Sequence, residues 1–158
     1  MSKELAIGHF LTLYSNTEGN ETQHFQNFYI NEDVEYDDDT YSFLPFGFGG
    51  ITISRSGDNV DANLVFPNND LSRDWSVVSI RSAWVARIRT MRLDPSDSTA
   101  TPTLFYDYTG QISEGGWDNT TVNMTVNSVL NAVSSNIPHR VLEMSNVGYI
   151  PTTTSVRV

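Results

Sequence analysis

The chain contains no cysteine among its 158 residues. This absence excludes disulfide bonds and metal sites built from thiolates. No stretch approaches the roughly 18 consecutive apolar residues that a membrane-spanning helix needs. The first residues, MSKELAIGHF, form a broken apolar run without a small-residue cleavage site, so we expect neither a signal peptide nor a membrane association.

Basic residues are scarce. The chain has 9 Lys and Arg against 19 Asp and Glu, which gives a formal net charge of −10. A general nucleic-acid binder neutralises phosphates with Lys and Arg, so this balance argues against such binding. It is compatible with a wall past which DNA slides, because repulsion prevents sticking. The plainer explanation is that the acidity keeps the protein soluble.

Motifs that carry enzyme chemistry are also missing. His9, His24 and His139 are too far apart in the sequence for a zinc motif. The G-x-S-x-G elbow and the Walker and dinucleotide-binding glycine patterns are absent. Carboxylate pairs for glycoside hydrolysis are numerous, but nothing selects one pair. We therefore expect no enzyme and no cofactor.

One acidic cluster is a candidate for metal chemistry. Glu35 and the three aspartates at 37–39 supply the oxygen ligands that calcium prefers, but their spacing matches no dedicated calcium loop. A solvated β-turn explains the cluster more simply. An alternative function stays open, namely a β-sandwich module that binds carbohydrate or calcium through residues 37–39 and exposed aromatics such as Tyr36 and Tyr41.

Composition and patterning predict a mainly β fold. Hydrophobic residues make up 39% of the chain, and Gly, Asn, Ser and Thr are plentiful. Residues 34–66 have the pattern of hairpin, bend and hairpin, with the chain broken at Gly49 and Gly50. Residues 60–66 and 121–129 alternate apolar and polar side chains, as half-buried strands do. The prediction is a single domain with a β-sandwich or split β-barrel and one or two short helices.

Other segments receive local predictions. Residues 3–14 fit either a short helix or a strand, and residues 24–30 fit a strand. The longest strand is predicted at 84–93, with a returning strand at 103–110. Residues 113–116, Ser-Glu-Gly-Gly, are predicted to form a turn.

Residues 71–83 are predicted to form a short helix. Trp75 and Val78 fit a helical spacing, and Ser72 or Asp74 is the predicted cap. A helical turn or two is also predicted at 128–136.

Arginines gather on one predicted strand. Trp84 lies on one face of residues 84–93, and Arg87 and Arg89 lie on the other. This strip fits surface salt bridges with the acidic turns, each worth little. It fits equally well a subunit interface, where Arg is enriched for pairing with carboxylates. The candidate interface residues are Trp84, Arg87 and Arg89, together with Tyr149, Ile150, Val156 and Val158 from a β-prone C-terminal stretch.

Several segments, taken in order, resemble the minor tail protein L-type (baseplate hub, tail tube-like) family of long-tailed phages. They cover residues 24–142. The segments are Tyr41-Ser42-Phe43-Leu44-Pro45-Phe46 before a glycine, Trp84-Val85-Ala86-Arg87-Ile88-Arg89, Tyr108-Thr109-Gly110, the alternating strand at 122–126, and Ile137-Pro138-His139-Arg140. The resemblance implies an N-terminal segment at 1–23, a tail hub-like β-domain at 24–142 and an extended C-terminal arm at 143–158.

The resemblance also implies a function. Members of that family are structural proteins that build rings around the DNA channel, usually threefold at the hub and sixfold in the tube. The chain is thus expected to be a virion component of a phage tail, made in the host cytoplasm. It would form a homotrimeric or hexameric ring, bridge neighbouring tail or baseplate proteins and let DNA pass without specific binding. The family's cysteine-containing extension, associated with an iron–sulfur cluster, is missing, so no cluster is implied.

Overall fold

The computed structural model describes residues 6–15, 22–53 and 60–128. The described part contains one helix and nine strands. The elements are β1 (Ala6–Tyr14), β2 (Thr22–Gln26), β3 (Val34–Tyr36), β4 (Asp39–Phe43), β5 (Gly47–Ile53), β6 (Val60–Pro67), α1 (Asp70–Arg81), β7 (Val85–Leu93), β8 (Thr103–Trp117) and β9 (Thr121–Ser128).

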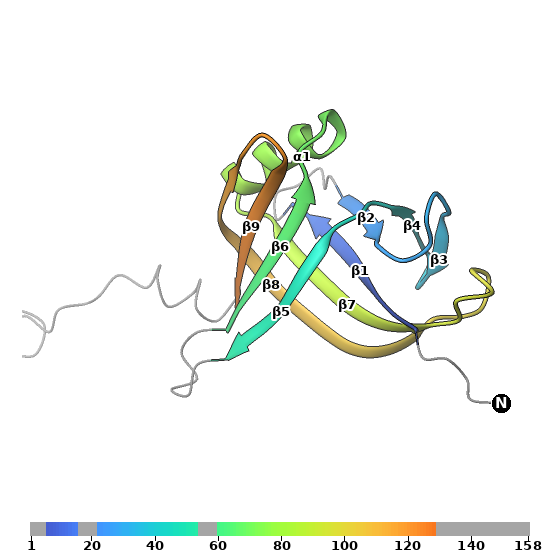
Figure 1. The fold of residues 1–158 in the computed structure, drawn as a ribbon. Coiled ribbons are helices and arrows are strands. Elements are labelled where there is room, and N and C mark those ends of the chain that lie inside the picture. The colour runs from blue at the N-terminus through green and yellow to red at the C-terminus, as the bar shows by residue number, and fades with distance from the viewer. Residues whose placement is uncertain (1–5, 16–21, 54–59, 129–158) are drawn as a thin grey trace, which may run out of the picture.

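All nine strands belong to one mixed sheet, in the order β3-β4-β2-β1-β7-β8-β9-β6-β5. The pairs are antiparallel except for β2 with β4, which is parallel. The long strands β7 and β8 curve together, and β5 and β6 pass across them (Figure 1). The predicted mainly β, sandwich-like fold with a short helix is confirmed.

Strand β1 settles the ambiguity at the N-terminus. It is a strand and not a helix, and it lies between β2 and β7 in the middle of the sheet. Leu11 and Leu13 point into the main core, whereas Phe10 points to the opposite face. Strand β1 therefore belongs to the same sheet as the strands that follow residue 23.

The main core joins buried residues of β1, β6, β7, β8 and β9 with Trp75 of α1. Strands β6 and β9 face it with the alternation expected from the sequence, and their buried side chains are directly paired across the two strands. The buried side chains of both strands lie on the same face of the sheet, where they pack against one another in the main core. The paired residues are Ala62 with Val126, Leu64 with Met124, and Phe66 with Val122.

A smaller core lies on the opposite face. Phe10 of β1 and Met91 of β7 are fully buried there under Val34 and Tyr41 of the β3–β4 hairpin. The ring centroids of Phe10 and Tyr41 are 4.8 Å apart. Both faces of β1 and β7 are thus covered, which explains why these strands carry apolar residues at successive positions.

Strand β2 is shorter than the predicted strand at 24–30. It ends at Gln26, whose buried side chain takes over the hydrogen bonds of the following backbone. The amide oxygen of Gln26 accepts from the N–H groups of Phe28 and Tyr29, both at 2.8 Å, and its amide nitrogen donates to the carbonyl oxygens of Tyr29 and Glu32. At this bend, the hydrogen bonds of the Gln26 side chain replace those that a neighbouring strand would make.

Helix α1 confirms the predicted helix but not its cap. Asn69 is the N-cap, because its side chain accepts from the N–H of Ser72 at 2.9 Å and the Ser72 hydroxyl accepts from the N–H of Asn69. Ser72 is therefore the reciprocal partner in a capping box, and Asp74 takes no part in it. Trp75 is buried together with Ser72, Ser76 and Ser79, whereas Val78 is exposed.

The predicted turn at 113–116 is wrong, because β8 continues through it to Trp117. A Cβ atom on Gly115 would lie 2.5 Å from Cδ1 of Ile80, so this glycine makes room for α1. The chain reverses instead after Asp118, whose carboxylate accepts from the N–H groups of Thr120 and Thr121. These hydrogen bonds lower the pKa of Asp118 to about 2.

The bend predicted at Gly49 and Gly50 is present, but it lies inside one strand and does not break it. Strand β5 runs through both glycines with a β-bulge, and Gly50 has a φ of 81°. Glycine adopts this backbone conformation without steric cost, so the bulge bends the strand without ending it. The second predicted helix, at 128–136, lies almost wholly outside the described residues.

Candidate functional site

The residues predicted to form an interface have different surroundings. Trp84 is only 2% exposed and belongs to the main core, and Arg89 is 4% exposed. These two side chains are used inside the chain, which corrects the expectation of an open basic strip. Arg87 is partly exposed. The other candidates, Tyr149, Ile150, Val156 and Val158, lie outside the described residues.

Arg87 is held by an acidic residue of the neighbouring strand. Its Nε lies 3.1 and 3.0 Å from the two carboxylate oxygens of Asp107 on β8, and its second guanidinium nitrogen lies 2.5 Å from one of them. The hydrogen bonds to Asp107 raise the pKa of Arg87. The pair is bidentate and neutral as a unit, and it fixes both side chains on one face of the sheet.

Arg89 ties the acidic β3–β4 hairpin to the sheet. Its guanidinium lies 3.2 Å from a carboxylate oxygen of Asp37, 3.4 Å from the hydroxyl of Tyr41, and 5.3 Å from the centroid of the Tyr36 ring. Its Nε also lies 4.0 Å from the Asp107 carboxylate. The salt bridge to an acidic turn that the sequence suggested is therefore present, but it is buried on the arginine side.

The acidic turn is a tight hairpin connection. Asp37 and Asp38 have φ angles of 59° and 66°. A two-residue type I′ turn between β-strands requires positive φ at both of its central residues. A hollow of about 300 Å³ beside the turn is lined by Glu35, Tyr36, Asp37, Asp38 and Thr40. Among the described residues, no three His, Cys, Asp or Glu side chains are grouped so as to hold a metal ion.

The aromatic residues near this turn are not exposed as the alternative function requires. Tyr41 is fully buried, with its hydroxyl 3.0 Å from that of Thr12, and burial raises its pKa. Tyr36 is half-buried, packed edge-on against Phe10 and beneath Arg89. Neither ring is presented as an open platform on which a sugar could stack.

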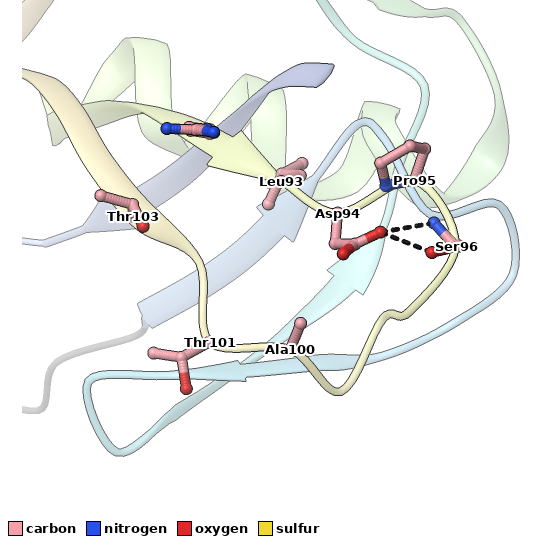
Figure 2. Close-up of a pocket in the computed structure, with 8 residues that line it drawn as sticks. Leu93, Asp94, Pro95, Ser96, Ala100, Thr101 and Thr103 are labelled. Carbon is pink, nitrogen blue, oxygen red and sulfur yellow. Dashed lines mark hydrogen bonds between the residues drawn. The ribbon is translucent and has the colours of Figure 1, made fainter. Parts of the chain in front are cut away.

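A second hollow lies inside the loop that joins β7 to β8 (Figure 2). It measures about 620 Å³, and its wall includes Leu93, Asp94, Pro95, Ala100 and Thr103. One oxygen of the Asp94 carboxylate accepts hydrogen bonds from the N–H and hydroxyl of Ser96 at 3.0 and 2.6 Å. These hydrogen bonds hold the loop in a turn.

The most prominent surface feature is one that sequence reasoning missed. Three consecutive apolar side chains of β8, Leu104, Phe105 and Tyr106, are all exposed, and Phe105 is 79% exposed. They span a β-bulge, since Thr90 is paired with Tyr106 and Met91 with Leu104, which leaves Phe105 as the extra residue. The sequence does contain a sign of this feature, namely three apolar residues in a row. A regular strand with one solvated face has alternating apolar and polar residues instead.

Residues 103–109 of β8 pair with β7, and the described pairing of β8 with β9 runs from Gly110 to Trp117. Exposed apolar side chains that lie together on a surface are typical of a place where another molecule binds.

No protein-family model matches the chain, and no curated protein matches it. Among solved structures, it is similar to a chain of the virion of a native gene transfer agent (GTA) particle, with a TM-score of 0.51 and 11% sequence identity. The match covers 82% of this chain and 41% of that chain, so this chain spans less than half the length of its match. At this identity the likeness shows a shared fold. No helix in the described residues is long and apolar enough to cross a membrane.

Proposed function

We propose that the chain is a structural component of a phage-like tail or baseplate hub, where copies assemble into a ring around the DNA channel. The observation that carries the proposal is the fold that it shares, over 82% of its length, with a chain of a gene transfer agent virion. The ordered resemblance of residues 24–142 to the phage hub family points in the same direction.

The mechanism in this proposal is assembly and not catalysis. The β-domains pack side by side, and loops and termini bridge to other tail or baseplate proteins. The net charge of −10 lets DNA pass through the channel without being bound specifically. Of the predicted interface residues, Tyr149, Ile150, Val156 and Val158 keep their proposed place in a C-terminal arm at 143–158 that contacts a neighbouring subunit.

The proposal predicts self-association that does not depend on calcium. The purified chain is to be measured by light scattering over a range of concentrations, with and without calcium. We expect a mass that rises with concentration to that of a trimer or hexamer and is unchanged by calcium. A monomer at all concentrations whose melting temperature rises with calcium would contradict the proposal and favour the alternative, a binding module, since a ligand that binds only the native state stabilises it.

A further inference from the structure

A third hollow lies between α1 and the turn that joins β8 to β9. These elements come together at one end of the sheet (Figure 1). The hollow measures about 540 Å³, and small-molecule sites in proteins measure roughly 300–1,000 Å³. Its wall includes Asn68, Arg73, Val77, Trp117, Asp118 and Asn119.

Hydrogen bonds hold the two sides of this hollow in a fixed arrangement. The N–H of Asn68 donates to the carbonyl oxygen of Thr120 at 2.8 Å, and its side-chain amide donates to the carbonyl oxygen of Asp118. The oxygen of the same amide accepts from Nε and from a terminal nitrogen of Arg73, at 3.1 and 3.0 Å. Asn68 thus ties α1 to the turn, so a ligand would meet a site that is already formed.

Trp117 gives the hollow an open aromatic wall. Its side chain is 58% exposed at the end of β8, whereas Trp75 and Trp84 are buried in the main core. Among the described residues of the wall, Val77 is the other apolar side chain, and the remaining ones are polar or charged. Such a surface suits a ligand that has one apolar face and polar edges.

The polar side chains of the wall supply both donors and acceptors. Arg73 forms no salt bridge with a described residue, and one of its terminal nitrogens is not used in bonding to Asn68. One oxygen of the Asp118 carboxylate accepts hydrogen bonds from the turn itself. The other oxygen accepts from the Thr121 hydroxyl at 2.9 Å, which does not exhaust its acceptor capacity. Asn119 adds an exposed amide, which both donates and accepts.

We propose that this hollow binds a neutral sugar residue of an oligosaccharide or polysaccharide. A pyranose ring has C–H groups on its face and hydroxyl groups around its edge, which matches an aromatic wall bordered by hydrogen-bonding side chains. Trp117 would pack against the ring face, while Arg73 would donate to its hydroxyl groups and Asp118 would accept from them. The charges of Arg73 and Asp118 offset each other, so the site favours a ligand without net charge. This site is separate from the acidic turn at 37–39, and it goes beyond the proposed assembly.

Calorimetric titration tests the site with four neutral probes, namely cellotetraose, maltotetraose, mannotetraose and chitotetraose. We expect at least one of them to bind the wild-type chain. Trp117→Ala should abolish this binding, whereas Trp117→Phe, which keeps an aromatic wall, should bind measurably. Arg73→Ala should raise the Kd about tenfold, the effect of losing one hydrogen bond to a charged group. Arg81→Ala, at another exposed arginine of α1, is the matched control and should bind like the wild-type chain.

Two further readouts show whether the sugar lies at Trp117 and whether the variants are folded. Saturation with the bound sugar should shift the fluorescence of the wild-type chain to shorter wavelength, since the other two of its three tryptophans are already buried. Far-ultraviolet circular dichroism should be the same for every variant. Failure of all four sugars to bind the wild-type chain would overturn the proposal, and so would binding that survives Trp117→Ala. Either result would leave the proposed assembly standing, because the oligomeric mass tests it separately.

Discussion

Trp84→Ala is expected to lower the free energy of unfolding by about 4 kcal/mol, the range found for aromatic residues removed from a well-packed core. Trp84 is the largest fully buried side chain of the described residues, and its cluster includes residues of β1, β6, β7, β8 and β9. The loss has two parts, the apolar area no longer buried and the cavity that the surrounding strands cannot fill. Chemical denaturation followed by far-ultraviolet circular dichroism measures the change.

Trp117→Ala is the matched control for this prediction. The same side chain is removed, but Trp117 is 58% exposed at the end of β8, so its loss should change stability by less than about 1 kcal/mol. Equal effects of the two substitutions would contradict the assignment of Trp84 to the core. A folded Trp84→Ala variant that has lost only its self-association would restore Trp84 as an interface residue.

Gly110→Ala is expected to destabilise the protein by about 3 kcal/mol, at the upper end of what overpacking costs. A Cβ atom at this position would lie 2.5 Å from the carbonyl oxygen of Asn127 and 2.7 Å from Cγ1 of Val126. Backbone on β9 cannot move away without breaking the pairing of Gly110 with Ser128. The position is therefore crowded, and the backbone of β9 beside it is held in place by the pairing with β8.

Gly116→Ala provides the control on the same strand. No atom lies within 4 Å of a Cβ built on Gly116, so alanine should change the free energy of unfolding by less than about 1 kcal/mol. The two variants are to be compared by denaturant unfolding under identical conditions. Similar midpoints for both would show that the close approach of β9 at Gly110 does not limit the fold.

Strands with one solvated face could be predicted from the sequence. The alternation in β6 and β9 identified the inward rows correctly, and their registers match in the structure. The strand at 84–93 was also recognised, with Trp84 and Arg89 on opposite faces, although both of its faces are covered in the structure. Period-two patterns are local and need no knowledge of distant contacts.

Features that depend on distant contacts could not be predicted. Gly115 and Gly116 look like a turn, and only the position of Ile80 on α1 reveals why β8 needs a small residue there. Gln26 ends β2 by bonding to backbone that comes later in the chain. Asn69 lies three residues before Ser72, one of the two predicted caps, so the identity of the cap depended on the exact start of α1.

The candidate site shows the same division. Arg89 has the spacing of an outward-facing residue, but the β3–β4 hairpin folds over it and buries its guanidinium beside Asp37 and Tyr41. The exposure of Leu104, Phe105 and Tyr106 on β8 was missed in a different way, since the sequence did not reveal that the strand contains a β-bulge at Phe105. Solvent exposure depends on which strands are neighbours, and the topology decides this.

The most direct test of the proposed assembly compares the oligomeric mass of three proteins by light scattering at matched concentrations. These are the wild-type chain, Phe105→Asp and, as the control, Ile30→Asp, which adds the same charge at another exposed apolar position. We expect the wild-type chain and Ile30→Asp to form the same ring-sized oligomer. Phe105→Asp should be a folded monomer, because a carboxylate among the exposed apolar side chains of Leu104, Phe105 and Tyr106 would be costly to bury between subunits. A wild-type chain that never associates would contradict the proposed assembly, and an oligomer of Phe105→Asp with the wild-type mass would exclude this apolar run from the interface.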